Sequence, residues 1–242
     1  MKILLAVTTY NQIEYTKKFL NHWNQNAHPN VNLIFIDDKS TDGTVKWLKE
    51  QRHNVITRKA AKGLTWSWNI AYRIFKEKGY DYLIIANNDI LIPNGVINNL
   101  VRDCKDRQII CPMSTKNGAG HNWKEQAIEK HFPKLKNQSD SFANYQVIQN
   151  TIQDKGEVKT MSKFNGFFFM FSRSIIESEF NSKNLFDPKF TNVHQEGDLQ
   201  KRLKTKPALS TSSFIFHFKG VSFPKKGLID GKDIRQNLNL YH

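Results

Sequence analysis

One apolar run that stops abruptly at polar residues constrains the fold of this chain more than any other stretch. Residues 81–92 read Asp-Tyr-Leu-Ile-Ile-Ala-Asn-Asn-Asp-Ile-Leu-Ile. A short continuous apolar run is typical of a strand buried on both faces, as in a parallel sheet. We therefore expect Asn87, Asn88 and Asp89 at the carboxyl end of a central strand, where open α/β sheets bind ligands. A polar turn that only ends the strand is the alternative.

Strand and helix patterns alternate through the N-terminal half. Apolar β-type runs cover residues 3–9, 31–36 and, more weakly, 55–57, and apolar residues at helical spacing cover 14–25, 44–51 and 64–78. A helix from Pro93 to about Cys104 and a strand at 108–113 come after the run at 81–92. This order predicts an α/β fold with a mostly parallel sheet.

The C-terminal half begins with a polar section, residues 114–163, which has few apolar runs and which we interpret as an insertion or a mobile segment on the acceptor side. An apolar strand at 164–171, a helix at 172–180 and a second helix at 194–203 come next. Residues 212–218 alternate like a last strand and place His217 near its end. We expect a single domain, residues 1–242, with halves at 1–113 and 164–242.

Charge is the most informative part of the composition, at a formal +14 with a pI near 9.7. Between residues 199 and 235 there are two anions, Asp230 and Asp233, and nine cations: Lys201, Arg202, Lys204, Lys206, Lys219, Lys225, Lys226, Lys232 and Arg235. Such a surface suggests an anionic partner, whether a phosphate-bearing substrate, nucleic acid or an anionic membrane. A solvated surface on a Lys-rich protein is the alternative.

Two absences limit where the chain is expected to work. No run approaches the roughly 18 apolar residues of a membrane span, and Met1–Leu4 leads directly into a strand pattern, so we expect a cytoplasmic protein without a transmembrane segment. Peripheral contact with a membrane stays open. Cys104 and Cys111 are expected to pack as small apolar residues.

Six short motifs, in this order and spacing, resemble family 2 of the GT-A glycosyltransferases over most of the chain outside 114–163. They are Thr8-Thr-Tyr-Asn11, Ile36-Asp-Asp-Lys-Ser-Thr-Asp-Gly-Thr44, Lys62-Gly63 with Asn69, Asn87-Asn88-Asp89, Asn165-Gly166, and Phe186-Asp187 leading to Gln195-Glu-Gly-Asp-Leu199 with Arg202. The resemblance implies a GT-A, Rossmann-like fold with helices on both faces of the sheet.

The resemblance also implies a site for a nucleoside-diphosphate sugar, with uridine favoured. Thr8, Tyr10 and Asp37 would contact the base and ribose, Tyr10 through its ring face and Asp37 through a carboxylate that accepts an N–H or hydroxyl. For Asp38 and Asp42 structural capping is the alternative, which we favour for Asp42. The residues assigned to this site are Thr8, Tyr10, Asp37, Asp38, Lys62, Asn69, Asn87 and Asn88.

By the same resemblance Asp89 stands at the metal-binding carboxylate of the DXD motif, where a divalent cation, Mn²⁺ or Mg²⁺, neutralises charge on the leaving diphosphate. The chain departs from that motif because Asn87 and Asn88 are amides. His217 resembles a histidine that completes the metal site in relatives, and an imidazole ligand suits Mn²⁺ better than Mg²⁺. A histidine packed in a strand is the alternative for His217.

The acidic motif before the last helix implies the catalytic base. Register from Leu199 and Arg202 places Gln195 and Glu196 at the usual Glu-Asp pair, so Glu196 is expected to deprotonate the acceptor hydroxyl, with inversion at the anomeric carbon. Gln195 is a departure from the pair. Asp198 is the second candidate for the base, with capping of the helix start as its alternative role.

The resemblance leaves several acceptors and functions open. The acceptor is expected to be an envelope glycan or a lipid-linked or otherwise anionic sugar; the alternative is DNA with a hydroxymethylated base, where His121 and Trp123 would enter a groove. A non-catalytic sugar-nucleotide-binding protein also stays open. A nucleotidyltransferase is disfavoured, because Thr8–Gln12 offers neither the glycine nor the cation of a triphosphate loop.

Overall fold

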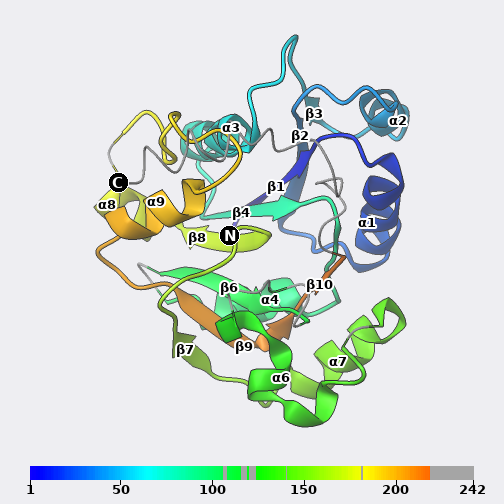
Figure 1. The fold of residues 1–242 in the computed structure, drawn as a ribbon, viewed down its shortest axis with the longest axis vertical. Helices are drawn as coiled ribbons and strands as arrows, with labels where there is room; N and C mark the ends of the chain where they lie inside the picture. The colour runs from blue at the N-terminus through cyan, green and yellow to red at the C-terminus, as the bar shows by residue number, and fades with distance from the viewer. Residues whose placement is uncertain (106–107, 116–118, 120–123, 140, 181, 219–242) are drawn as a thin grey trace.

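The computed structural model describes residues 1–242 except 106–107, 116–118, 120–123, 140, 181 and 219–242. Its described part contains an eight-stranded sheet in the order β3-β2-β1-β4-β8-β6-β9-β7 and a two-stranded sheet, β10-β5 (Figure 1). The strands are β1 Ile3–Thr9, β2 Val31–Asp37, β3 Val55–Ile56, β4 Tyr82–Asn87, β5 Ile90–Leu91, β6 Ile109–Met113, β7 Val158–Thr160, β8 Phe168–Ser172, β9 Ala208–Phe214 and β10 Phe216–His217.

The large sheet is mostly parallel, which confirms the predicted α/β class. Strands β3, β2, β1 and β4 pair in parallel, as do β6 and β9. Two strands run against the others: β8 is antiparallel to both β4 and β6, and β7 is antiparallel to β9. The α-helices are α1 Ile13–Asn26, α2 Thr44–Glu50, α3 Leu64–Lys78, α4 Val96–Asp103, α6 Ile128–His131, α7 Tyr145–Ile152, α8 Arg173–Glu179 and α9 Gln195–Arg202.

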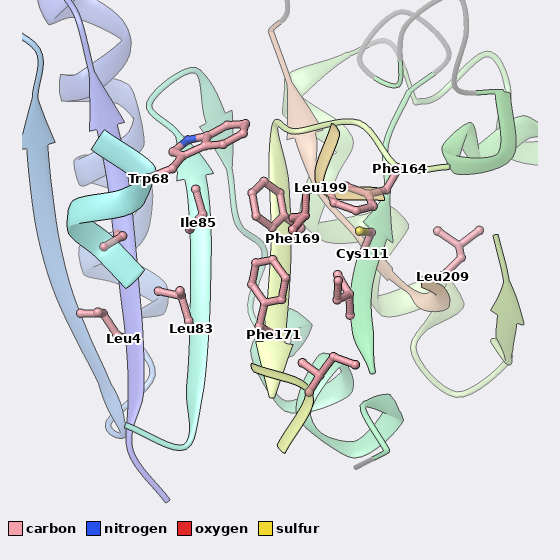
Figure 2. Packing of buried hydrophobic residues seen from close by; sticks show 14 of the residues in the cluster. Leu4, Trp68, Leu83, Ile85, Cys111, Phe164, Phe169, Phe171, Leu199 and Leu209 are labelled. Atoms are coloured by element: carbon pink, nitrogen blue, oxygen red, sulfur yellow. The ribbon is translucent and has the colours of Figure 1, made fainter. Parts of the chain in front are cut away.

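Both faces of the sheet are covered, because its central strands are apolar on both sides. Alternate residues of β1 enter two different cores: Leu4 and Ala6 pack with α3, α8 and α9, whereas Leu5 and Val7 pack with α1, α2 and α4. Figure 2 shows Phe169 and Phe171 of β8 projecting between β4 and β6 in the first of these cores. No helix in the described residues is long and apolar enough to cross a membrane.

Two segments predicted as single strands are each divided between the two sheets. The run at 81–92 forms β4, which ends at Asn87, and the separate strand β5. The run at 212–218 forms the end of β9 and then β10, which pairs with β5 so that His217 lies opposite Ile90. Helix α4 also begins later than predicted, at Val96 and not at Pro93. Gly95, with a φ of 88°, is the residue that precedes the helix.

A bulge at the end of β9 allows this change of sheet. Ser210 is opposite Pro112, but the next paired residue, Phe214, is opposite Met113, so three residues of β9 have no partner on β6. Buried Gln149 of α7 holds the bulge by accepting from Phe214 N at 2.8 Å and donating to Ser212 O at 2.9 Å. Asn99 of α4 donates to the same Ser212 oxygen at 2.7 Å.

The section 114–163 is therefore structural where it is described. It contributes α6, α7, three short 3₁₀ turns and β7, and β7 extends the large sheet beyond β9. Apolar side chains of α6 and α7, Ile128, Ile148 and Ile152, are fully buried in the core. The sequence predicts an insertion or a mobile segment here, whereas the described residues form helices in the core and a strand of the large sheet. These elements escaped prediction because polar residues interrupt the apolar runs by which buried segments are usually recognised.

Replacing Gln149 by Leu will lower the free energy of unfolding by about 2 kcal/mol, because it leaves the buried Phe214 N–H without an acceptor. Chemical denaturation measures this. The matched control is Gln146→Leu in the same helix, whose partners are partly exposed and whose loss will cost no more than about 0.5 kcal/mol. Equal costs for the two variants would contradict the role given to Gln149.

Candidate functional site

A cavity of about 360 Å³ lies at the carboxyl ends of β1, β2 and β4. This is the edge at which parallel α/β sheets bind ligands. Its walls come from those strand ends, from the residues that precede and begin α3, and from the segment before α9. The lining residues are Thr8, Thr9, Tyr10, Asp38, Ala61, Lys62, Gly63, Leu64, Ser67, Asn87, Asn88, Thr191 and Asn192.

Of the eight residues expected to contact the nucleotide sugar, six line this cavity: Thr8, Tyr10, Asp38, Lys62, Asn87 and Asn88. Tyr10 is 37% exposed and so offers a ring face to a ligand. Asn69 is not a lining residue. Its amide donates to Phe186 O at 2.8 Å and accepts from Phe186 N at 2.9 Å, so it ties α3 to the Phe186 segment.

The carboxylates of Asp37, the last residue of β2, and Asp38 lie in different surroundings. Asp37 is fully buried and accepts from Thr9 Oγ1 at 2.8 Å, from Ser40 through its backbone N and hydroxyl, and from Thr57. It is not a lining residue, so the base contact expected of Asp37 does not fit its position. Successive side chains of a strand point to opposite faces, and Asp38 consequently faces the cavity. Asp42 caps, as favoured, by accepting from Ile13 N and Thr44.

Thr191 and Asn192 form a part of the cavity wall that the sequence analysis did not predict, and the backbone of Gly63 allows them to pack there. Gly63 has a φ of 87°, and an added Cβ would lie 2.7 Å from Thr191 O, so the segment before α9 packs directly on this glycine. Asn192 accepts from Leu64 N at 3.1 Å, and Thr191 O accepts from Thr65 N at 3.0 Å. Thr191 and Asn192 cap the start of α3 from over a hundred positions away, and no local pattern signals this.

The expected metal ligands Asp89 and His217 lie together, and Asp89 comes directly after the cavity-lining Asn88. His217 Nε2 is 3.4 Å from Asp89 Oδ1, and both side chains are buried. Phe218 N donates to Asp89 O at 2.9 Å, and the His217 ring stacks on Phe167 with 4.7 Å between centroids. Neighbouring Asn88 donates to Thr16 Oγ1 at 2.9 Å, which turns that amide toward α1.

This pair fits a divalent cation in part. Asp89 Oδ1 is buried and has no hydrogen-bond partner among the described residues, as expected of an oxygen that accepts a ligand from outside the protein. The described residues contain no group of three His, Cys, Asp or Glu side chains suited to a metal ion. The chain would therefore supply two ligands, one oxygen and one nitrogen, a set that suits Mn²⁺.

Glu196 occupies a dry position at the start of α9. Burial raises the pKa of its carboxyl group, and Oε2 has no hydrogen-bond partner in the described part of the chain. The neighbouring Gly166 makes room for Trp68, because an added Cβ there would lie 2.7 Å from the Trp68 ring; the same Cβ would lie 3.5 Å from Glu196 Oε1, an ordinary contact distance. Figure 2 shows Trp68 lying beyond the Phe169 ring, at the end of the apolar core.

Asp198 lies two residues further along α9 in a different environment. Its Oδ2 accepts a hydrogen bond from Arg202 Nε at 2.9 Å, and Arg202 Nη2 lies 2.9 Å from the same oxygen. Arg202 Nη2 also donates to Leu185 O at 2.8 Å, so this ion pair joins α9 to the chain before it. The Asp198 carboxylate is thus already engaged in an ion pair within its own helix, whereas Glu196 Oε2 has no partner among the described residues. Of the two candidates for the base, the geometry favours Glu196.

Part of the expected anion-binding surface lies outside the described residues. This holds for His121, Trp123, Lys219, Lys225, Lys226, Lys232 and Arg235. The described cations Lys201, Arg202, Lys204 and Lys206 are all exposed.

Relatives show which kind of protein shares this arrangement. A curated relative, the undecaprenyl-phosphate mannosyltransferase of Micrococcus luteus, is 30% identical over 94 residues, which are 37% of this chain and 38% of the relative.

Solved structures share the fold at low identity. GalNAc-T7 with UDP, GalNAc and Mn²⁺ has a TM-score of 0.63 at 13% identity, over 90% of this chain and 44% of that one. The mannosyltransferase PcManGT of Pyrobaculum calidifontis with GDP-Man and Mn²⁺ has a TM-score of 0.58 at 16% identity, over 93% of this chain and 58% of that one. S. aureus TarS with UDP-GlcNAc has a TM-score of 0.61 at 11% identity, over 94% of this chain and 62% of that one.

This chain thus spans less than two thirds of the length of each of these relatives. The family model of glycosyl transferase family 2 matches residues 5–180, well over half of the chain. The chain belongs to glycosyl transferase family 2.

Proposed function

We propose that this protein transfers a sugar from a nucleoside-diphosphate sugar, with a UDP-sugar favoured, to an acceptor hydroxyl with inversion. The observation that carries the proposal is a buried carboxylate oxygen, Glu196 Oε2, which has no hydrogen-bond partner among the described residues and lies on the helix after the cavity wall. A carboxyl group whose pKa is raised by burial is a stronger base than an ordinary one. Thr8, Tyr10, Asp38, Lys62, Asn87 and Asn88 would hold the donor in the cavity.

The chemistry is a single displacement. Glu196 takes the proton of the acceptor hydroxyl as that oxygen attacks the anomeric carbon. The new carbon–oxygen bond forms on the face opposite the leaving group, while the bond from the anomeric carbon to the diphosphate oxygen breaks. The bonding electron pair leaves with the nucleoside diphosphate, and the proton stays on Glu196. Gly166 lies beside this carboxylate, and Glu196 Oε2 is buried, so water has little access to that oxygen.

Asp89 and His217 would hold a divalent cation, Mn²⁺ or Mg²⁺. When bound, such a cation supplies Lewis-acid stabilisation of the negative charge on the departing diphosphate. Two of the structural relatives contain Mn²⁺ beside a nucleotide or nucleotide sugar, which supports the choice of Mn²⁺.

A lipid-linked or other anionic acceptor is the acceptor we propose. The support is the relative named for undecaprenyl phosphate, together with the basic composition of the chain. The same net charge makes DNA an alternative, but none of the relatives described above is named for a nucleic-acid acceptor. Peripheral contact with an anionic membrane is compatible with the exposed lysines after α9, Lys204 and Lys206.

Replacing Glu196 by Gln will lower turnover by about 10²- to 10⁴-fold, because the amide cannot take the proton. The measurement is UDP release from UDP-sugars in the presence of polyprenyl-phosphate acceptors, with UDP affinity as a check that the donor site is intact. Asp198→Asn is the matched control, since it removes a carboxylate from the same helix and is expected to keep most activity. If the Asn variant lost activity and the Gln variant kept it, the base would be Asp198.

The same Glu196→Gln variant will be more stable than the parent at neutral pH. Burial raises the pKa of Glu196 in the folded state, so the ionised carboxylate destabilises the fold above the unfolded pKa, and the penalty grows until pH passes the folded pKa. Below about pH 4 the Glu196 carboxyl group is mostly protonated, and so uncharged, in both the folded and the unfolded state. Thermal unfolding will thus show a higher midpoint for the variant at pH 7 and no difference at about pH 4. A variant that melts lower at pH 7 would disprove the buried charge.

Replacing Asp89 by Asn will weaken Mn²⁺ binding in the presence of UDP by more than about tenfold, since even loss of a group that only supports a ligand commonly costs that much. Titration calorimetry with Mn²⁺ measures the effect. Asp81→Asn, an exposed carboxylate just before β4, is the control and will bind Mn²⁺ as the parent does. Unchanged Mn²⁺ affinity in the Asp89 variant would remove Asp89 from the metal site.

A further inference from the structure

The structural relatives carry two different nucleotides, UDP in one case and GDP-Man in another, so the shared fold does not select the base. The selection has to come from side chains at the cavity. Asp38 is the acidic residue that lines the cavity, and its carboxylate contacts two backbone N–H groups and one guanidinium. A role for Asp38 in selecting the base of the donor nucleotide rests on the proposed function, since that function supplies the donor.

Most acceptor positions of Asp38 are already occupied by the protein. An ionised carboxylate has about four lone-pair positions, two on each oxygen. Oδ1 accepts from Lys62 N at 2.9 Å and lies 3.0 Å from Arg58 Nε, whereas Oδ2 accepts from Gly63 N at 2.7 Å. One position, on Oδ2, is left for a ligand in the cavity.

Arg58 is the side chain that completes the contacts of Oδ1 without lining the cavity itself. Its side chain is 10% exposed, and its guanidinium carbon lies 4.0 Å from the centroid of the Trp66 ring. Burial lowers the pKa of Arg58, and the charge and hydrogen bond of Asp38 oppose that change. A stacked and nearly buried guanidinium has little freedom to leave Asp38.

We infer that Arg58 is a specificity-determining residue, which limits Asp38 to one open acceptor position and so selects a uracil-type base over guanine. Uracil presents a single ring N–H, which one lone pair of Oδ2 satisfies. Guanine presents two neighbouring N–H donors, from the ring and the exocyclic amine, and a carboxylate pairs with both only when each oxygen has a free position. With Oδ1 occupied, one guanine donor would be buried without a partner, which disfavours binding.

Arg58 acts through Asp38 and is thus a positioning residue, and the test must separate this from a merely structural role. The chain offers a close match in Arg173, which is also stacked on an aromatic ring, Phe75 at 4.6 Å, and paired with a carboxylate, Glu177 at 3.1 Å. Arg173 belongs to α8 and does not line the cavity. Loss of its packing will affect stability alone.

The experiment measures the Kd values of UDP and GDP, each with Mn²⁺, by titration calorimetry on the full chain. The parent is expected to bind UDP at least about tenfold more tightly than GDP. In Arg58→Met the ratio will fall about tenfold, because Oδ1 becomes free to accept a second N–H. Arg58→Lys, which keeps a cation beside Asp38, will give a ratio between the two, and Arg173→Met will keep the parent ratio.

Three results would overturn the inference: a parent that binds GDP as tightly as UDP, an Arg58→Met variant with an unchanged ratio, or an Arg173→Met variant whose ratio changes as much. Should Arg58→Met fail to fold, the parent ratio and the Lys variant still decide. A failure of the proposed function looks different, because the parent would then bind neither nucleotide diphosphate.

Discussion

The antiparallel pairing of β5 with β10 is the contact on which the proposed site depends. It joins the segment after β4 to the last described strand. Asp89 and His217 are far apart in sequence, yet Asp89 Oδ1 lies 3.4 Å from His217 Nε2. The pairing exists because β4 stops at Asn87 and because β9 leaves the large sheet at its bulge. Gln149 and Asn99 hold that bulge from two helices, so the polar section between β6 and β8 helps to place His217.

The buried polar residues differ in how fully their hydrogen bonds are satisfied. Asp37, Asn69 and Gln149 are buried with partners for their oxygens, and each ties two segments together. Asp89 Oδ1 and Glu196 Oε2 are buried without such partners among the described residues. Side chains such as Gln108, Ser114 and Gln195 also carry a buried atom without a partner in the described part of the chain, so the missing partner supports a ligand at Asp89 and Glu196 only together with their positions in the family motifs.

How far the sequence predicts this structure differs between local and long-range features. The helix at 64–78 is predicted at its observed bounds, because helical spacing and the Lys62-Gly63 boundary are both local. The strand at 212–218 is predicted as one element because its alternation continues through Ile215, although the backbone there changes sheets. Pairing with β5 determines that change, and strand pairing between distant segments leaves no local periodicity.

The candidate site shows the same limit. Six of the eight residues predicted to contact the donor line the cavity, because strand ends converge on one edge of a parallel sheet. Asp37 and Asp38 could not be told apart, since the sequence does not show which of two consecutive side chains faces the cavity. Thr191 and Asn192 were missed because they reach α3 through tertiary packing.

The single carboxylate of the Asn87-Asn88-Asp89 motif has a consequence for how the cation and the donor bind in the proposed mechanism. Asn88 donates through Nδ2 to Thr16 Oγ1, which fixes the orientation of its amide, and a neutral amide oxygen does not supply the charge of the missing acid. Asp89 and His217 leave most of the coordination positions of a divalent cation to other ligands, and the diphosphate of the donor supplies oxygens of the hard type that such cations prefer. Cation and donor would then complete one site together, each raising the affinity of the other, as thermodynamic linkage requires.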